Sequence, residues 1–184
     1  MRTTADDDMD DPVDRELRDL IAAQRHEAQA QERRHRYWLL RQAEESGTLH
    51  GVLADLADLR ATVRVDTSVS TVVDAVVVEV GRDFVALVEP GGKRHVLAIA
   101  ALTAVRRSTR TRPVTGDRPV DASTDLADVL RSVAPDHPEI TAVLSDGTSV
   151  VGILQSVGGD VARLVADGGE AYVPMRAIVE VTIA

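Results

Sequence analysis

The sequence predicts a mainly β protein that has an α-helical N-terminal arm and two tandem five-stranded small barrels, each preceded by a short helix. Residues 63–107 and 140–183 each contain five short runs of alternating apolar residues, separated by turns rich in Gly, Asp and Pro. The two stretches resemble each other at a nearly constant offset, which indicates an internal repeat. Residues 13–45 contain neither Gly nor Pro, which favours one long helix.

Composition and charge exclude several classes of protein. The chain has no cysteine, no apolar run long enough to span a membrane and an acidic N-terminus, so we expect a soluble, cytoplasmic protein. The net charge of −9 argues against a general affinity for nucleic acid. Only the middle third is net basic, and it keeps that option open. Heavy use of Ala, Val, Asp and Arg, with Lys93 as the single lysine, is typical of a GC-rich bacterial genome.

The N-terminal region is expected to form an acidic tail and a helical arm. Residues 1–11 are rich in aspartate and have nothing to bury, so they are predicted to be disordered. Residues 12–46 are predicted to be helical, but residues 24–36 are almost wholly polar, which favours a projecting helix or a weak coiled coil. We predict a partner-binding site at the apolar end of this helix, formed by Tyr37, Trp38 and Leu40.

The remaining chain divides into two similar parts. Residues 47–107 are predicted to form a short helix capped by Thr48 and the first barrel. Residues 108–124, which are rich in Thr, Ser, Arg and Pro, form a linker. Residues 125–184 form a second short helix, capped by Ser123 or Thr124, and the second barrel.

The internal repeat is clearest around two glycine-containing turns. Val80-Gly81-Arg82-Asp83 aligns with Val157-Gly158-Gly159-Asp160, and the same offset places Thr71 on Thr148 and Val96 on Val173. After one deletion, Ala101-Leu102 meets Ala177-Ile178. Both preceding helices contain Leu-Ala-Asp. The alignment does not decide between two separate barrels and one merged sheet.

A family resemblance rests mainly on the start of the second copy. There Ser145-Asp146-Gly147-Thr148 precedes Val151-Gly152-Ile153-Leu154, so that a turn after the first strand leads to a glycine at which the second strand can bend. A short helix followed by five bent strands resembles the Sm-like barrel of Sm, LSm and Hfq-type proteins.

The resemblance implies the fold more strongly than an RNA site. The family usually has Asp and Asn flanking a hydrophobic residue after strand two, and Arg-Gly near strand five. The chain differs at those positions in both copies, where it has Gly158, Val161, Ala162 and Pro174-Met175 in one, and Gly81, Phe84, Val85 and Leu97-Ala98 in the other.

We find no pattern typical of a catalytic, metal or cofactor site and expect a non-enzymatic protein without a small-molecule substrate. Pro90-Gly91-Gly92-Lys93 lacks the strand-to-helix context of a phosphate loop and is predicted to be a hairpin turn. Asp83 and Asp160 follow glycine and are expected to make Asx-type turn bonds. The histidines are spaced apart, which favours surface or capping roles; they are His26, His35, His50, His95 and His137.

One cluster of basic residues could bind the phosphates of RNA or DNA. Its members are Lys93, Arg94, His95, Arg106, Arg107, Arg110 and Arg112. Few aromatic residues accompany them, so base stacking is poorly supplied. The alternative is that the arginines pair with the acidic tail or with the acidic second copy.

Two functions follow as hypotheses. The first is a non-enzymatic scaffold that binds protein partners or itself through the tandem Sm-like barrels and the helical arm, without a membrane. The alternative is an RNA- or DNA-binding regulator resembling Hfq-type RNA chaperones, which would use the Arg-rich end of the first barrel.

Overall fold

The computed structural model describes residues 29, 31–39, 41–42, 45–108, 114–117 and 122–183. The chain divides into two units, residues 1–45 and residues 46–184. Every described residue of the first unit is helical, as predicted. The predicted acidic tail and the predicted first part of the long helix lie outside the described residues.

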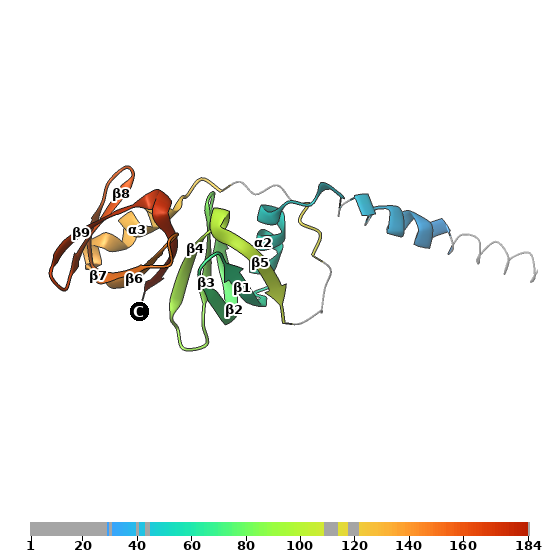
Figure 1. The fold of residues 1–184 in the computed structure, drawn as a ribbon. Coiled ribbons are helices and arrows are strands. Elements are labelled where there is room, and N and C mark those ends of the chain that lie inside the picture. The colour runs from blue at the N-terminus through green and yellow to red at the C-terminus, as the bar shows by residue number, and fades with distance from the viewer. Residues whose placement is uncertain are drawn as a thin grey trace, which may run out of the picture. The chain divides into compact units, whose positions relative to one another are not determined.

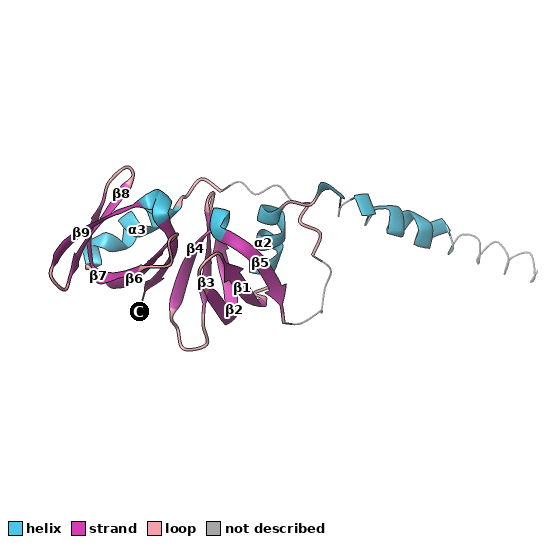
Figure 2. Ribbon diagram, viewed as in Figure 1, coloured by secondary structure: helices cyan, strands magenta, loops and turns pink. Residues whose placement is uncertain are grey.

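The second unit is mainly β (Figures 1 and 2). The α-helices named among its described residues are α2 (Leu49–Asp58) and α3 (Leu126–Val133), and each precedes five strands. The first five strands are β1 (Thr62–Thr67), β2 (Thr71–Val80), β3 (Phe84–Val88), β4 (Arg94–Ala98) and β5 (Leu102–Arg107). The second five are β6 (Glu139–Leu144), β7 (Ser149–Val157), β8 (Val161–Ala166), β9 (Gly169–Pro174) and β10 (Ile178–Ile183). We call α2 to β5 the first half and α3 to β10 the second half.

All ten strands belong to one antiparallel sheet, in the order β5-β1-β2-β3-β4-β10-β6-β7-β8-β9. Within each half the order is the same, because β10, β6, β7, β8 and β9 follow the pattern of β5, β1, β2, β3 and β4. The two halves are joined edge to edge by β4 and β10, which decides in favour of one merged sheet. Among the described residues the sheet does not close, and β5 and β9 are its two edges.

Each half has its own hydrophobic core, because alternate residues of its curved strands face inward. In the first half, Leu53 and Leu56 of α2 pack with Val63, Val77 and Leu87 of the strands. In the second half, Leu126 and Leu130 of α3 pack with Ile140, Leu154 and Leu164.

The helix ends show one confirmed and one wrong prediction. Thr48 caps α2, and its hydroxyl oxygen accepts a hydrogen bond from the backbone N–H of Gly51 at 3.0 Å. The cap of α3 is Asp125, and neither Ser123 nor Thr124 takes this role. Asp125 is favoured because its carboxylate accepts from the N–H of Asp128 while the Asp128 carboxylate accepts from the N–H of Asp125, which completes a capping box.

Part of the predicted linker, residues 114–117, packs against α2. The backbone oxygen of Gly116 accepts a hydrogen bond from the N–H of Thr48, and the Gly116 N–H donates to the carboxylate of Asp55. A Cβ at Gly51 would lie 1.9 Å from the oxygen of Gly116. The glycine in α2 therefore allows two backbone segments to approach closely.

The strand register corrects the sequence alignment of the copies. Val96 pairs with Ala86, and Tyr172 makes the corresponding pair with Arg163, so Tyr172 and not Val173 is the counterpart of Val96. The cause is a turn between β8 and β9 that is shorter than the turn between β3 and β4. Thr148 likewise matches Ser70 rather than Thr71, because the two carbonyls accept equivalent turn hydrogen bonds.

Gly152 lies in β7 where the backbone of β8 approaches. A Cβ at this position would lie 2.5 Å from the carbonyl oxygen of Val165. The predicted need for a residue without a Cβ is confirmed at Gly152, whereas its counterpart in the first half is the buried residue Ala75.

Candidate functional site

The most elaborate site is the junction at which the two halves meet. Its backbone is the antiparallel pair β4 and β10, in which Leu97 lies opposite Glu180, Val96 opposite Val181, His95 opposite Thr182 and Arg94 opposite Ile183. Edge strands carry backbone donors and acceptors that need partners. The junction satisfies those of one edge from each half.

Apolar side chains of both halves pack together at the junction. Phe84, Ala86 and Val96 belong to the first half, but they pack into the hydrophobic core of the second half together with Leu126 and Val181. All five are almost completely buried. The first half therefore supplies part of the wall that closes the second core.

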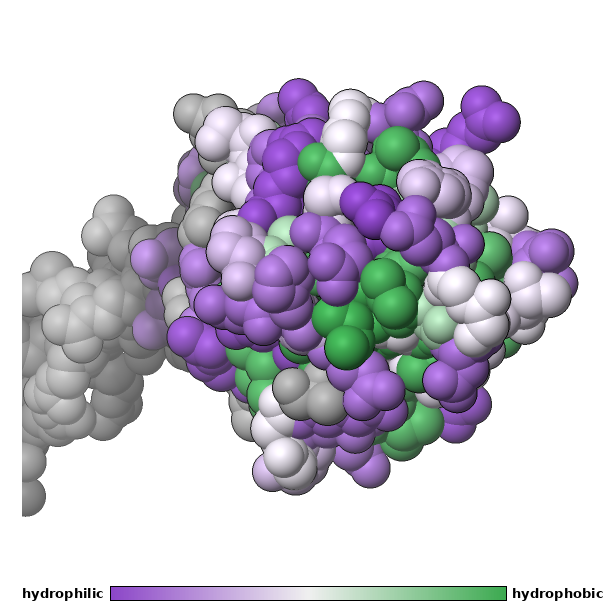
Figure 3. All heavy atoms as spheres, turned by 90° about the vertical axis from the view of Figure 1, so that its left-hand side faces the viewer, coloured by the Kyte–Doolittle hydropathy of each residue, from purple (hydrophilic) through white to green (hydrophobic). Residues whose placement is uncertain are grey.

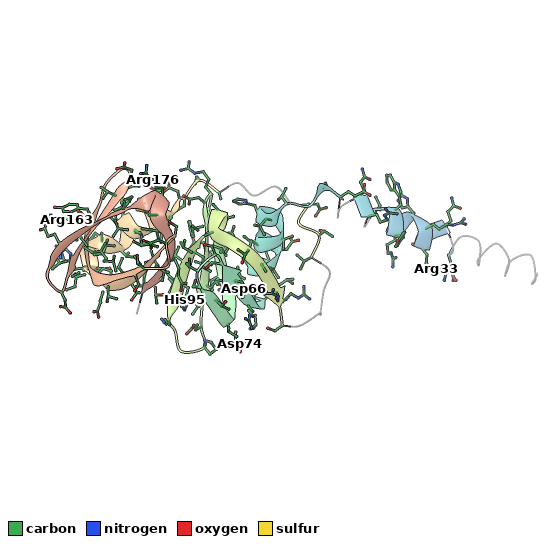
Figure 4. All side chains as sticks on the ribbon, in the orientation of Figure 1. Arg33, Asp66, Asp74, His95, Arg163 and Arg176 are labelled. Atoms are coloured by element: carbon green, nitrogen blue, oxygen red, sulfur yellow. The ribbon has the colours of Figure 1, made fainter. Side chains whose placement is uncertain are left out.

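A buried polar cluster lies within this apolar contact. His95, labelled in Figure 4, is 4% exposed and Glu180 is 5% exposed. The imidazole Nδ1 of His95 donates to Glu180 Oε1 at 2.7 Å, and the Ser70 hydroxyl donates to Glu180 Oε2 at 2.6 Å. The His95 Nε2 lies 3.0 Å from Glu89 Oε1, but out of line for a hydrogen bond. One carboxylate of the second half is thus held by two side chains of the first.

The environment of Glu180 favours its charged form. Burial raises the pKa of Glu180, but hydrogen bonds from His95 and Ser70 oppose this effect and leave the pKa below its ordinary value. The carboxylate therefore stays ionised inside the junction, where an unpaired charge would be costly.

The start of α3 is also held by the first half. The side chain of Asp83, in the turn between β2 and β3, accepts a hydrogen bond from the N–H of Leu126 at 2.8 Å. The Arg82 guanidinium pairs with Asp125 at 2.5 Å. For Asp83, the predicted local Asx-type turn is therefore wrong, because its carboxylate caps a helix of the other half. The side chain of Asp160 has no equivalent bond within the described part of the chain.

The two free edges of the sheet are the structural counterparts of the junction strands. The edge strand β5 corresponds to β10, so Ala104 and Val105 correspond to Glu180 and Val181. The edge strand β9 corresponds to β4, so Ala171 and Tyr172 correspond to His95 and Val96. The two ends of the sheet therefore carry strands equivalent to the two junction strands, β10 and β4, but with different side chains.

Residues at these free ends expose apolar surface that the junction buries. Tyr172 on β9 is 64% exposed, whereas its counterpart Val96 is completely buried. Leu49, the first residue of α2, is 44% exposed, whereas Leu126, the first residue of α3, is 4% exposed. Figure 3 looks onto the end that carries β8 and β9, and apolar side chains lie in its middle among polar ones.

Ion pairs order the exposed side chains of β8 and β9. Glu170 pairs with Arg163 and accepts a hydrogen bond from the Tyr172 hydroxyl at 2.7 Å. The pKa of Glu170 is lowered, first by its hydrogen bond with Arg163 and then by the one with Tyr172. The free edge at β9 therefore carries an ionised carboxylate at the position that Arg94 occupies on β4.

The described basic residues predicted to bind nucleic acid come from two parts of the first half, the end of the turn before β4 with β4 itself, and β5. Lys93 and Arg94 are exposed near the turn between β3 and β4, whereas His95 is buried in the junction, so its predicted surface role is wrong. Arg106 and Arg107 lie on β5, and Arg106 pairs with Asp66. Arg110 and Arg112 lie outside the described residues.

The predicted partner-binding residues of the helical arm are exposed where the structure describes them. Tyr37 is 65% exposed and Trp38 is 58% exposed, and the Trp38 ring stacks on His35. Leu40 lies outside the described residues. Exposed aromatic side chains of this kind are common anchors in protein interfaces.

A groove of about 820 Å³ lies on the first half. Val76, Val78 and Val88 supply its apolar lining, and Arg60 and Asp74 are among the charged residues around it. Because its charges have both signs, the groove does not favour a ligand of one charge.

Sequence reasoning missed Glu180. A signal existed, because Glu180 is the single charged residue in the otherwise apolar or uncharged strand Ile178–Ile183. A carboxylate in such a strand needs a buried partner. The partner could not be identified from the sequence, since His95 lies far away in the chain.

Comparisons with protein-family models, curated proteins and solved structures found no match to this chain. Among the described residues, no helix has both the length and the apolar character to span a membrane. The same residues contain no group of three or more His, Asp or Glu side chains that could hold a metal ion.

Proposed function

We propose that this chain is a non-enzymatic scaffold whose two halves are Sm-like small barrels and which assembles head to tail with further copies of itself. In this proposal the free edge β9 of one copy pairs with the free edge β5 of the next. The exposed aromatic residues Tyr37 and Trp38 of the helical arm remain available for another protein.

One observation carries this proposal: the chain already makes such a contact once, between β4 and β10, and each side of it recurs at an end of the sheet, where no described strand pairs with it. The two sides differ from each other, so the contact is heterologous. A heterologous contact with both sides present on every copy leads to rings or to open chains.

Charge supports the same pairing. By analogy with the register of β4 and β10, Arg107 of β5 would lie opposite Glu170 of β9, and Val105 would lie opposite Tyr172. Opposite charges across paired strands are favourable. The arginines of β5 would thus meet the acidic second half of the next copy.

Light scattering at increasing protein concentration tests this function. We expect the average mass of the wild-type protein to rise above that of one chain. Tyr172→Asp and Leu49→Asp should each reduce this association, because both positions are exposed in the single chain but correspond to buried positions of the junction.

Val151→Asp is the matched control. Val151 is 50% exposed on β7, and the equivalent position of the first half, beside Asp74 on β2, is not part of the junction. This variant should associate like the wild type. A wild-type mass that remains that of one chain at high concentration would contradict the proposed function.

A further inference from the structure

We infer that charge on the four strand edges dictates which edges can pair, so that β4 joins only β10 of its own chain while β5 joins only β9 of another copy. This inference rests on the proposed head-to-tail assembly and adds a specificity mechanism to it. It follows from the residues that face each other in the matched and in the crossed pairings.

The two matched pairings bring hydrogen-bond partners, opposite charges or apolar groups together. In the internal junction, His95 of β4 meets Glu180 of β10. In the pairing between copies, Arg107 of β5 would face Glu170 of β9, while Ala104 and Ala171 replace the internal Glu180 and His95. The internal contact therefore has a polar pair at its centre, whereas the contact between copies has alanines at those two positions and the charged residues Arg106, Arg107 and Glu170 toward one end.

The first crossed pairing, β4 with β5, brings like charges together. In the register of the internal junction, Arg94 would lie opposite Arg107 and His95 would lie opposite Arg106. His95 would also lose the Glu180 carboxylate, which Ala104 would replace. Like charges directly opposite each other on paired strands are unfavourable.

The second crossed pairing, β9 with β10, leaves an acid without a base. Glu180 would lie opposite Val173, and Ala171 would occupy the place of His95. The Ser70 counterpart is Thr148, whose hydroxyl already donates to Asp146. Burying a carboxylate without its partner strongly disfavours a contact. Both crossed pairings are thus penalised, and a copy cannot readily insert between the two halves of another.

Disulfide trapping tests this pairing rule, and the absence of native cysteine keeps the experiment clean. Residues directly opposite each other on antiparallel strands are close enough to form a disulfide. Mixing a Val105→Cys chain with a Tyr172→Cys chain should give a disulfide-linked dimer under mild oxidation. Mixing Val105→Cys with Val96→Cys should give none, because that dimer requires the crossed pairing of β4 with β5.

A chain carrying both Val96→Cys and Val181→Cys is the positive control, since these residues face each other in the internal junction. It should form an intrachain disulfide, which shows that the thiol introduced by Val96→Cys can react. Equal dimer formation in the matched and crossed mixtures would overturn the inference while leaving the proposed assembly standing. A wild-type chain that does not associate would overturn both.

Charge reversal gives a second test that does not depend on cysteine. Arg107→Glu and Glu170→Arg should each weaken association by about tenfold or more, and the double variant should recover most of it. Because wild-type and double-variant chains place like charges opposite each other, a mixture should sort into separate assemblies. Free mixing of the two would refute the role of these charges.

Discussion

At the scale of single residues, Glu180 couples the two halves. Its carboxylate belongs to the second half, yet both of its strongest hydrogen-bond donors, His95 and Ser70, belong to the first. The pairing could not be predicted from the sequence, because alternation shows that a residue faces inward but not which distant side chain it meets. The same limit explains why His95 was expected at the surface.

Glu180→Gln should lower the free energy of unfolding by about 2 kcal/mol at neutral pH, because hydrogen bonds to a charged acceptor become neutral ones. The folded pKa of Glu180 lies below its unfolded value, so its stabilisation is complete above the ordinary glutamate range and is lost as the pH falls through the lowered pKa. The difference between wild type and variant should therefore shrink in acid. Denaturant unfolding over a pH series measures it.

Glu139→Gln is the control for this prediction, since Glu139 is an exposed carboxylate on β6, outside the proposed contact between copies. An exposed carboxylate contributes little to stability, so the unfolding free energy of this variant should stay close to that of the wild type. A difference between Glu180→Gln and wild type that does not change with pH would show that the carboxylate charge is not what stabilises the junction.

At the scale of secondary structure elements, α2 contains a residue, Gly51, that suits the segment packed against the helix better than it suits the helix itself. Glycine inside a helix normally weakens it. Here the backbone of Gly116 lies against Gly51 of α2, with the Thr48 N–H and the Asp55 carboxylate bonded to Gly116 on either side.

Gly51→Ala should therefore destabilise the protein by about 2 kcal/mol, although the same change in an open helix would stabilise it by about 1 kcal/mol. Thermal unfolding followed by circular dichroism measures the effect. Gly91→Ala is the matched control, because a Cβ there meets nothing within 4 Å and its φ is not positive. Equal melting temperatures for both variants would contradict the close approach of residues 114–117 to α2.

Elements were the most predictable level of this structure. The turns at Gly81, Gly91 and Gly147 separate the strands where the sequence places them, since glycine and its polar neighbours interrupt the apolar alternation. The copy alignment failed at Val173 because it placed the one-residue deletion after β9, whereas the structure shortens the turn before it. The alternation of inward and outward side chains cannot reveal such a one-residue shift here, because both candidate residues, Tyr172 and Val173, are apolar or aromatic.

At the scale of the whole molecule, the uneven charge along the sequence corresponds to a difference in charge between the two edge strands of the sheet. The basic residues Arg106 and Arg107 lie on one edge strand of the sheet, and the acidic residue Glu170 lies on the other. The sequence showed this imbalance but left open whether the halves merge, because edge pairing depends on complementarity between strands that are distant in the chain.

Salt should separate the two kinds of contact. Between copies the facing charges would be Glu170, which is exposed, and Arg107, which is half-buried, so raising the ionic strength should weaken self-association in sedimentation experiments. Within the chain, the His95 and Glu180 side chains are buried and screened much less, so the free energy of unfolding should change by less than about 1 kcal/mol. Association that strengthens with salt would instead indicate a contact driven mainly by apolar surface.

The β4 and β10 junction has a geometric consequence for any assembly of this chain. Each copy contributes two halves of the same strand order, so every assembly contains an even number of halves, and two chemically different junctions alternate along it. Any rotational symmetry of such an assembly then relates whole chains, each made of two halves, and not single halves. If the contact between copies repeats the internal geometry, the rotation from one copy to the next is twice the rotation that relates the two halves. A ring then closes only when a whole number of these rotations makes one full turn.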